Sequence, residues 1–366
     1  MKLTGEYLEQ AKKTDTFSPF EGSRHVGWKS PSNIALIKYW GKRENQIPQN
    51  PSLSFALQNS FTETAVEYST KLGNQPKLSF SFEGNSQPGF EERIKKTIAT
   101  FLPYMPFLAQ LDLKIESVNS FPHSSGIASS ASAMSALAFC MVSIEKQLFG
   151  TLTTSDAFMQ KASFLSRLGS GSACRSVYGN YSVWGYDPIV KHSTNEAAIP
   201  VLDQTENKLG PLGDAVMIVS SKPKKVSSSA GHGLMNNHPF AETRYEQARC
   251  HLKEIIKAIG ENNEKDFIRI VEHEALTLHA LMMSSENGFT LLAPNTWSII
   301  EKVRKYRDKS GLFVAFTLDA GPNVHLIYKI SDREKVLTFI KDELRGYCEN
   351  GYWIDDRMGS GPVELN

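Results

Sequence analysis

The chain has 366 residues, of which 40% are hydrophobic and 22% charged. This length suits two domains, and the composition is that of a folded globular protein. Its 40 Lys and Arg residues nearly balance 39 Asp and Glu residues, giving a formal charge of +1. That balance excludes a nucleic-acid binder that relies on bulk positive charge, so any anionic ligand needs a local cluster of cations.

The sequence has no pattern typical of a disulfide framework, a signal peptide or a membrane span. Four cysteines are widely spaced without a Cys-x-x-Cys pair, so the sequence predicts neither a disulfide framework nor a zinc site. Residues 1–27 are polar and lack the apolar core of a signal peptide. The most apolar stretch, residues 131–144, is interrupted by serines and is too short to cross a bilayer. We therefore expect a cytoplasmic protein with no membrane partner.

The first half of the chain mixes strands and helices. Residues 1–27 are predicted to form a polar extension with one short helix around residues 7–11. Extended or alternating patterns predict strands at 28–37, 52–57, 61–68, 78–82, 111–117 and 178–184. Helical spacing predicts helices at 91–102, 129–148 and 156–168, the last with Ser155 as its N-cap.

The second half follows a stretch rich in Pro and Gly, residues 187–213, which marks a candidate domain boundary. A strand is predicted at 215–219, a hairpin at 312–318 and 324–328, and helices at 243–259, 264–283, 295–306 and 333–344. Strands and helices alternate without a regular βαβ pattern in both halves. The sequence therefore predicts an α+β fold.

A loop of small residues, Pro122 to Ser130, leads from a strand into the helix that begins near Ser129. Its small side chains allow a ligand to approach the backbone, and the free N–H groups and dipole of the helix start attract phosphate. The serine hydroxyls could add a contact to phosphate or Mg²⁺. Close packing of the helix on a sheet explains the same composition equally well.

Residues 33–43 place three cations and a tyrosine hydroxyl directly after an apolar strand. In a strand, Lys38 and Lys42 would point to the same face because their separation is even. This segment could form a local anion site. A solvated edge strand protected by lysines is the alternative, and the segment taken alone favours it.

Residues 169–175 place two serine hydroxyls ahead of Arg175. Arginine can grip a carboxylate or phosphate through two parallel hydrogen bonds. A turn that carries a surface arginine is the simpler interpretation of this segment in isolation.

Asp319 ends an apolar strand and precedes Gly321-Pro322. Aspartate at such a position often bonds to its own backbone in a turn. The functional alternative is a half-buried carboxylate that a neighbouring cation keeps ionised. A fifth segment, residues 222–231, could add serine hydroxyls and positive charge, or could be a basic surface turn.

Metal-hydrolase and serine-hydrolase patterns have little support. The nine histidines include no His-Glu-x-x-His string, and no serine lies in a Gly-x-Ser-x-Gly elbow.

Four of these segments together, at residues 32–42, 121–130, 169–175 and 319–323, closely resemble the diphosphomevalonate decarboxylases of the GHMP kinase superfamily. The Tyr-Trp-Gly-Lys string at 39–42 and the Gly-Ser-Gly-Ser-Ala-Cys-Arg string at 169–175 are characteristic of this branch. The resemblance extends from about Trp28 to the C-terminus.

The resemblance implies a GHMP kinase fold with the active site in a cleft between two domains. Residues 28–210 would form the ATP-binding domain, which resembles ribosomal protein S5 domain 2, and residues 211–366 a ferredoxin-like domain, after an N-terminal extension at 1–27. Relatives are often homodimers, so a homodimer is expected.

The implied reaction belongs to the mevalonate pathway of isoprenoid biosynthesis. ATP, with Mg²⁺, would phosphorylate the 3-hydroxyl of mevalonate 5-diphosphate, and loss of phosphate and CO₂ would then give isopentenyl diphosphate. Asp319 would lie at the 3-hydroxyl as base or orienting group, and Lys38 would keep it ionised. Arg175 would hold the substrate carboxylate in line for elimination.

The resemblance also implies two sets of binding residues. The 5-diphosphate would be bound by Tyr39, Lys42, Ser170, Ser172 and Ser228. ATP would be bound by Pro122, Ser124, Ser125, Gly126, Ala128, Ser129 and Ser130, and the Ser130 hydroxyl is the candidate Mg²⁺ ligand.

One departure from the family pattern lies at residues 229–232, where Ser-Ala-Gly-His replaces the Arg-Asp-Gly-Met of some bacterial members and removes one cation. The alternatives are therefore a decarboxylase of the 5-monophosphate, a mevalonate-type kinase, and a non-catalytic nucleotide binder. The intact set of Asp319, Lys38 and Arg175 argues against the last two.

Overall fold

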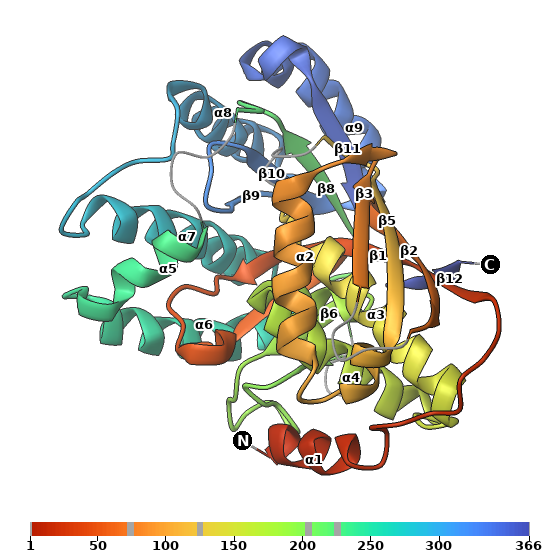
Figure 1. Cartoon of the computed structure of the whole chain (residues 1–366). Coiled ribbons are helices and arrows are strands. Elements are labelled where there is room, and N and C mark those ends of the chain that lie inside the picture. Colours follow the sequence, from red (N-terminus) through yellow and green to blue (C-terminus); the bar gives the residue numbers. More distant parts are fainter. Residues whose placement is uncertain (1, 72–76, 123–126, 202–206, 223–227, 366) are drawn as a thin grey trace.

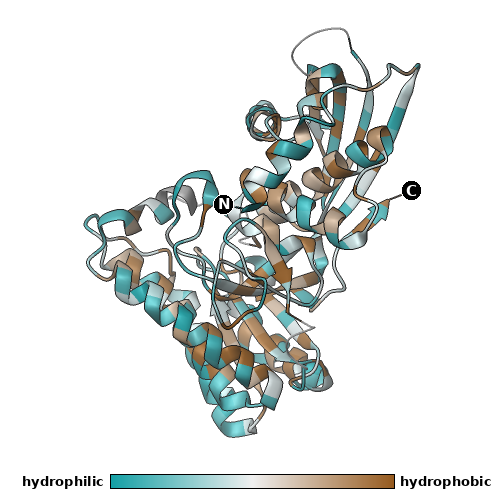
Figure 2. Cartoon of the chain, turned by 90° about the horizontal axis from the view of Figure 1, so that it is seen from below, coloured by the Kyte–Doolittle hydropathy of each residue, from teal (hydrophilic) through white to brown (hydrophobic). Residues whose placement is uncertain are grey.

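The computed structural model describes residues 2–71, 77–122, 127–201, 207–222 and 228–365, with the backbone alone at 228–230. Two sheets, each packed against helices, form two domains that meet along the middle of the molecule (Figure 1). This architecture confirms the predicted α+β class. The apolar residues of both domains lie mainly where helices and strands face one another, and polar residues cover the outer helix faces (Figure 2).

The first sheet has eight strands, ordered β12-β1-β2-β5-β3-β4, and β6 and β7 extend it from β2. All its pairs are antiparallel except β3 with β5. The strands are β1 (Ser23–Ile37), β2 (Ser52–Thr70), β3 (Lys77–Phe82), β4 (Asn85–Ser86), β5 (Leu111–Asn119), β6 (Tyr181–Trp184), β7 (Ala198–Pro200) and β12 (Val363–Leu365).

Helices α2 (Pro88–Phe101), α3 (Ser129–Phe149) and α4 (Ser155–Gly169) pack together beside this sheet. Helix α3 is buried over most of its surface, because its Ala, Ser and Met side chains let it lie close to β1 and β2. Its one buried acid, Glu145, accepts a hydrogen bond from Lys161 of α4 at 2.8 Å.

The second sheet is antiparallel, in the order β11-β8-β10-β9. Its strands are β8 (Leu212–Met217), β9 (Val314–Leu318), β10 (Val324–Lys329) and β11 (Trp353–Arg357), and its helices are α6 (Ala241–Glu261), α7 (Glu264–Met283), α8 (Pro294–Ser310) and α9 (Arg333–Phe339). A short helix, α5 (Ser228–Gly233), lies between β8 and α6 in the sequence. Helix α7 packs on β9 and also contacts β1, so it joins the two domains.

Some predicted boundaries were wrong. The two strands predicted at 52–57 and 61–68 form one strand, β2, because Asp356 accepts the main-chain N–H groups of Gln58 and Asn59 where the pattern breaks. Helix α4 is capped by Thr154, whose side chain accepts from the Ala157 N–H, and not by Ser155. Strand β1 ends at Ile37, so Lys38 and Lys42 lie beyond it and do not share a strand face as expected.

The polar extension contains helix α1 (Lys2–Ala11), which docks at the end of the molecule beside α4 (Figure 1). Tyr7 packs edge-on against Phe164 with ring centroids 4.9 Å apart. Glu196 accepts the N–H groups of Leu3 and Thr4 at 3.1 and 3.0 Å. A carboxylate from a distant loop therefore caps the start of this helix.

Replacing Glu196 by Ala should release α1. Loss of a capping acceptor costs about 1 kcal/mol in the free energy of unfolding, and trypsin should cleave faster at Lys12 and Lys13. Burial alone would raise the pKa of Glu196, but hydrogen bonds from Thr4 and Leu3 hold it below its ordinary value. The contribution is therefore present above the unfolded pKa and is lost as the pH falls through the folded one. Glu6→Ala, on the same helix, is the control; wild-type cleavage of Glu196→Ala would contradict the docking.

Candidate active site

One cavity between the domains brings together residues from the sequence segments singled out above. Its lining includes Lys38, Tyr39, Lys42, Ala128, Ser130, Ser170, Ser172, Arg175 and Asp319. These residues come from the end of β1, the start of α3, the segment after α4 and the β9–β10 loop. Segments that are far apart in the sequence therefore meet at one site.

Lys38 and Asp319 form an ion pair across the domain boundary. The Lys38 Nζ donates to Asp319 Oδ1 at 2.9 Å. Register shifts in β1 between Pro31 and Asn33 and between Ala35 and Ile37 bend the strand just before Lys38. The Lys38 side chain is 2% exposed and that of Asp319 27%, so the carboxylate faces the cavity. Burial lowers the pKa of Lys38, and the neighbouring Asp319 carboxylate opposes that shift.

Arg175 is buried, unlike the surface arginine that the sequence segment alone favours. It lies in the 3₁₀ segment Gly171–Val177, which directly follows α4. Its Nε donates to Asn33 Oδ1 at 3.3 Å and its Nη1 to the Ser52 hydroxyl at 2.5 Å. None of its hydrogen bonds to the described residues uses Nη2, so this edge of the guanidinium can serve a ligand in the cavity.

The far end of the cavity combines a cation with neutral donors. Lys42 donates to Gln46 at 2.9 Å. The Tyr39 hydroxyl is buried without a hydrogen-bond partner among the described residues, and burial raises its pKa, so it stays a neutral donor. An unpartnered buried hydroxyl is costly unless a ligand bonds to it.

His232 adds a second neutral donor at this end. The Gly41 N–H donates to its Nδ1 at 3.0 Å, so the proton of the neutral ring lies on Nε2. Burial lowers the pKa of His232 to about 3, with the Lys42 and Arg175 cations acting in the same direction. The ring lies between those of Tyr39 and Trp40, with centroids 4.2 and 4.8 Å away. His232 thus takes part in the cavity that the departure at 229–232 alters.

The small-residue loop is described in part. Ala128, at φ 39°, turns the chain into α3, and the Ser130 and Ser170 hydroxyls lie 3.4 Å apart. Ser129 lines a second cavity, whereas Pro122 is exposed and lines neither of these two cavities. Ser124, Ser125, Gly126 and the Ser228 side chain lie outside the described residues.

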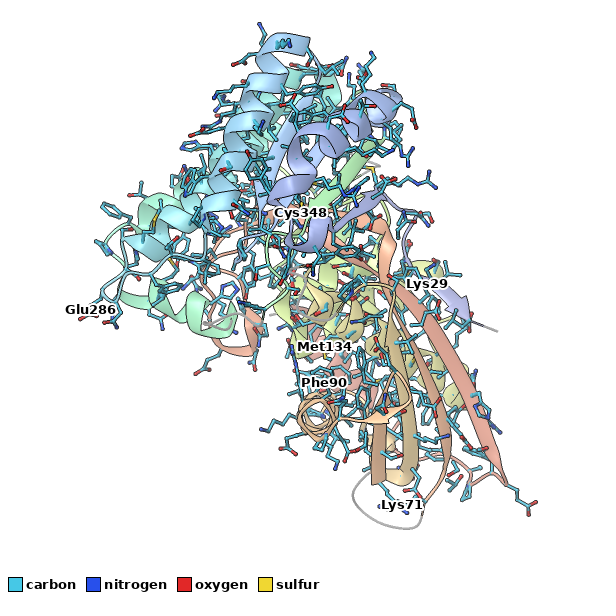
Figure 3. All side chains as sticks on the ribbon, turned by 90° about the horizontal axis from the view of Figure 1, so that it is seen from above. Lys29, Lys71, Phe90, Met134, Glu286 and Cys348 are labelled. Carbon is cyan, nitrogen blue, oxygen red and sulfur yellow. The ribbon has the colours of Figure 1, made fainter. Side chains whose placement is uncertain are left out.

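The second cavity is apolar and adjoins the first. Its lining includes Phe80, Phe82, Phe90, Ile94, Ala133, Met134 and Leu137. Figure 3 labels Phe90 of α2 and Met134 of α3, which both line this cavity. Arg93 and Ser130 line both cavities, so the two are contiguous at the N-terminus of α3.

Sequence reasoning missed Arg93, Gln46 and His232 as site residues. Arg93 belongs to an amphipathic helix whose spacing indicates only packing, and Gln46 lies in a polar loop without a pattern. His232 was visible only as a departure from the family string.

A metal ion would find few ligands here. Within the part of the chain that is described, no three His, Cys, Asp or Glu side chains cluster in a way that could hold one. Mg²⁺ commonly keeps waters and substrate phosphates as ligands, and a single hydroxyl such as that of Ser130 fits this mode. The described helices include none that is both long and apolar enough for a membrane span.

Comparisons with known proteins identify the family of the chain. Residues 30–195 match the diphosphomevalonate decarboxylase-like N-terminal domain, and residues 215–356 match the mevalonate 5-diphosphate decarboxylase C-terminal domain. The diphosphomevalonate decarboxylase of Candida albicans is 28% identical over 324 residues, covering 85% of this chain and 86% of the relative.

Solved structures share the whole fold. A mevalonate diphosphate decarboxylase from Legionella pneumophila is 30% identical, with a TM-score of 0.75 over 90% of this chain and 100% of that one. The structure of MDDEF in complex with MVAPP, AMPPCP and magnesium is 26% identical, with a TM-score of 0.79 over 94% and 100%. The chain has the predicted GHMP kinase fold and belongs to the diphosphomevalonate decarboxylase family.

Proposed function

We propose that this protein is an ATP-dependent diphosphomevalonate decarboxylase, which converts mevalonate 5-diphosphate into isopentenyl diphosphate, ADP, phosphate and CO₂. The observation that carries the proposal is the Lys38–Asp319 pair, 2.9 Å apart, beside a buried arginine in one interdomain cavity. The relatives named above, one of them bound to MVAPP and AMPPCP, support it. We also propose that residues 28–210 and 211–366 are the two functional domains, with the start of β1 (from Ser23) and strand β12 (Val363–Leu365) completing the sheet of the first.

The ion pair serves the first step, phosphoryl transfer to the tertiary 3-hydroxyl. Asp319 orients that hydroxyl and accepts its proton, because it is the acid of the pair whose side chain is open to the cavity. Lys38 keeps the carboxylate ionised and offsets negative charge on the transferring phosphoryl group. A loose phosphoryl-transfer transition state needs no early proton removal.

Arg175 serves the second step, the elimination. Phosphate is a far better leaving group than hydroxide, and its departure builds positive character at C3 while the carboxylate leaves as CO₂. The guanidinium holds that carboxylate in line with the breaking C–O bond. Its two bonds to Asn33 and Ser52 fix its orientation, and its burial excludes water from the reacting centre.

The 5-diphosphate lies at the other end of the cavity. Tyr39, Lys42, Ser170, Ser172 and Ser228 bind it, and the Nε2–H of His232 adds a neutral donor. The string Arg-Asp-Gly-Met of some bacterial members would place one more cation at this end. Here hydrogen bonds from the Tyr39 hydroxyl and His232 take over part of its role.

ATP lies across the two contiguous cavities. Its phosphates meet the start of α3, with Pro122, Ser124, Ser125, Gly126, Ala128, Ser129 and Ser130 as the proposed binding residues. Its base fills the apolar second cavity, which shares Arg93 and Ser130 with the first. Mg²⁺, held by the Ser130 hydroxyl and phosphate oxygens, would supply charge neutralisation for the transfer.

A coupled assay tests the function directly. The protein, ATP and Mg²⁺ should release ADP and CO₂ in equal amounts from mevalonate 5-diphosphate, with lower kcat/KM for the 5-monophosphate. Release of ADP without CO₂ would indicate a kinase, and preference for the 5-monophosphate would indicate the sibling decarboxylase. Neither product from any mevalonate derivative would refute the proposal.

Asp319→Asn should lower kcat at least about a hundredfold, because the amide cannot accept the hydroxyl proton. The affinity for ATP, measured by fluorescence titration, should change little. The exposed Asp308→Asn is the matched control and should turn over like the wild type. Turnover by Asp319→Asn near the wild-type rate would remove Asp319 from its role.

Filling the second cavity should weaken nucleotide binding alone. Ala133→Phe projects a ring into this space, so the KM for ATP should rise about tenfold, the scale of a lost apolar contact. The KM for mevalonate 5-diphosphate should not change. Ala157→Phe, on α4 away from both cavities, is the control; an unaltered KM for ATP in Ala133→Phe would place the base elsewhere.

We further propose that the protein forms a homodimer and lies in the cytoplasm. Light scattering coupled to gel filtration would measure the mass in solution, and a monomer at micromolar concentration would overturn the dimer. Fractionation of the source cells would test the location.

A further inference from the structure

Helix α7 holds the main chain of both members of the catalytic ion pair. Its Glu274 accepts the Lys38 main-chain N–H through Oε2 at 2.8 Å. Its His279 lies 3.0 Å, through Nε2, from the main-chain oxygen of Asp319, and because a carbonyl oxygen only accepts, the histidine donates. The two side chains are five residues apart, which is about 7.5 Å along a helix axis. One rigid element therefore contacts both partners.

Arg244 of α6 binds the other polar main-chain group of Lys38. Its Nη2 donates to the Lys38 main-chain oxygen at 2.9 Å and to Glu274 Oε2 at 2.6 Å. Its Nη1 donates to Glu274 Oε1 at 2.7 Å. Both polar main-chain groups of Lys38, a residue of the first domain, are thus bonded to side chains of the second.

The ion pair between Glu274 and Arg244 is buried, where an unpaired charge is strongly unfavourable. Glu274 is fully buried and Arg244 is 2% exposed. Burial alone would raise the pKa of Glu274, but Arg244, His251 and the Lys38 N–H hold it at about 2. Buried ion pairs often stabilise a fold no better than apolar residues of the same volume would. Apolar residues could not, however, form hydrogen bonds with the main-chain N–H and oxygen of Lys38.

We propose that Glu274, Arg244 and His279 are positioning residues, through which α7 sets the separation of Lys38 and Asp319 for the reaction. The inference rests on the proposed function, since it assigns these residues to that reaction's ion pair. A shift of about 1 Å in a reacting group can cost a hundredfold in rate. The ammonium and the carboxylate come from different domains, so their distance depends on such contacts.

The first test compares two buried acids. Glu274→Gln should lower kcat by about ten- to a hundredfold while each KM changes by less than about twofold. Glu145→Gln breaks the buried Lys161 pair inside the first domain and should leave kcat unchanged at a similar loss of thermal stability. Equal effects on kcat, normalised to folded protein, would overturn the positioning role of Glu274.

The second test uses a milder site, in case Glu274→Gln does not fold. His279→Ala removes the donor to Asp319 and should lower kcat with little change in KM. His279→Gln retains an N–H donor at similar reach and should restore most of the rate. Equal rates for the Ala and Gln variants would refute the role of His279.

Hydrogen exchange gives a readout that does not depend on activity. Peptides covering residues 36–42 should exchange faster in Glu274→Gln, and peptides covering 317–323 faster in His279→Ala, whereas Glu145→Gln should alter neither. An inactive wild type would refute the proposed function but would still allow this measurement. Unchanged exchange in both α7 variants would refute the inference.

Discussion

The structure depends on one short contact between charges that belong to different domains. Lys38 directly follows the bent strand β1 of the first domain, and Asp319 follows β9 of the second. Burying an ammonium is unfavourable unless an anion compensates it, so the pair can form only where both domains close over it. The same closure forms the cavity and makes electrostatic forces inside it stronger than they would be in water.

Around this contact, the site divides its tasks by charge. The buried cations Lys38 and Arg175 lie in the part of the cavity where the proposed reaction moves negative charge. The end proposed to hold the 5-diphosphate combines one cation, Lys42, with neutral donors, the Tyr39 hydroxyl and His232. The apolar second cavity lies beyond the start of α3, where an aromatic base needs little polar contact. In a protein of almost zero net charge, such a local arrangement supplies what the proposed binding of two polyanions requires.

Much of the fold and the main site residues could be predicted from the sequence, each from a different kind of signal. Helix α7 was predicted to its exact ends because its apolar spacing is regular, and the β9–β10 hairpin because breakers bound it. The family strings indicated Lys38, Arg175 and Asp319, which the structure brings into one cavity. The Glu274–Arg244 pair gave no signal, because a Glu and an Arg on amphipathic helices usually face solvent. Its partners, main-chain groups over 200 residues away, exist only once the chain has folded.

Strand β12 has a consequence for the order of events in biosynthesis. Residues 363–365 pair with Gly27, Trp28 and Lys29 of β1, so they cover an edge of the first sheet. The ribosome makes them only after the whole second domain. Until then, the first domain presents an open strand edge, which is where nascent chains tend to associate wrongly. The newly made first domain thus carries this exposed strand edge until the second domain and β12 have been synthesised.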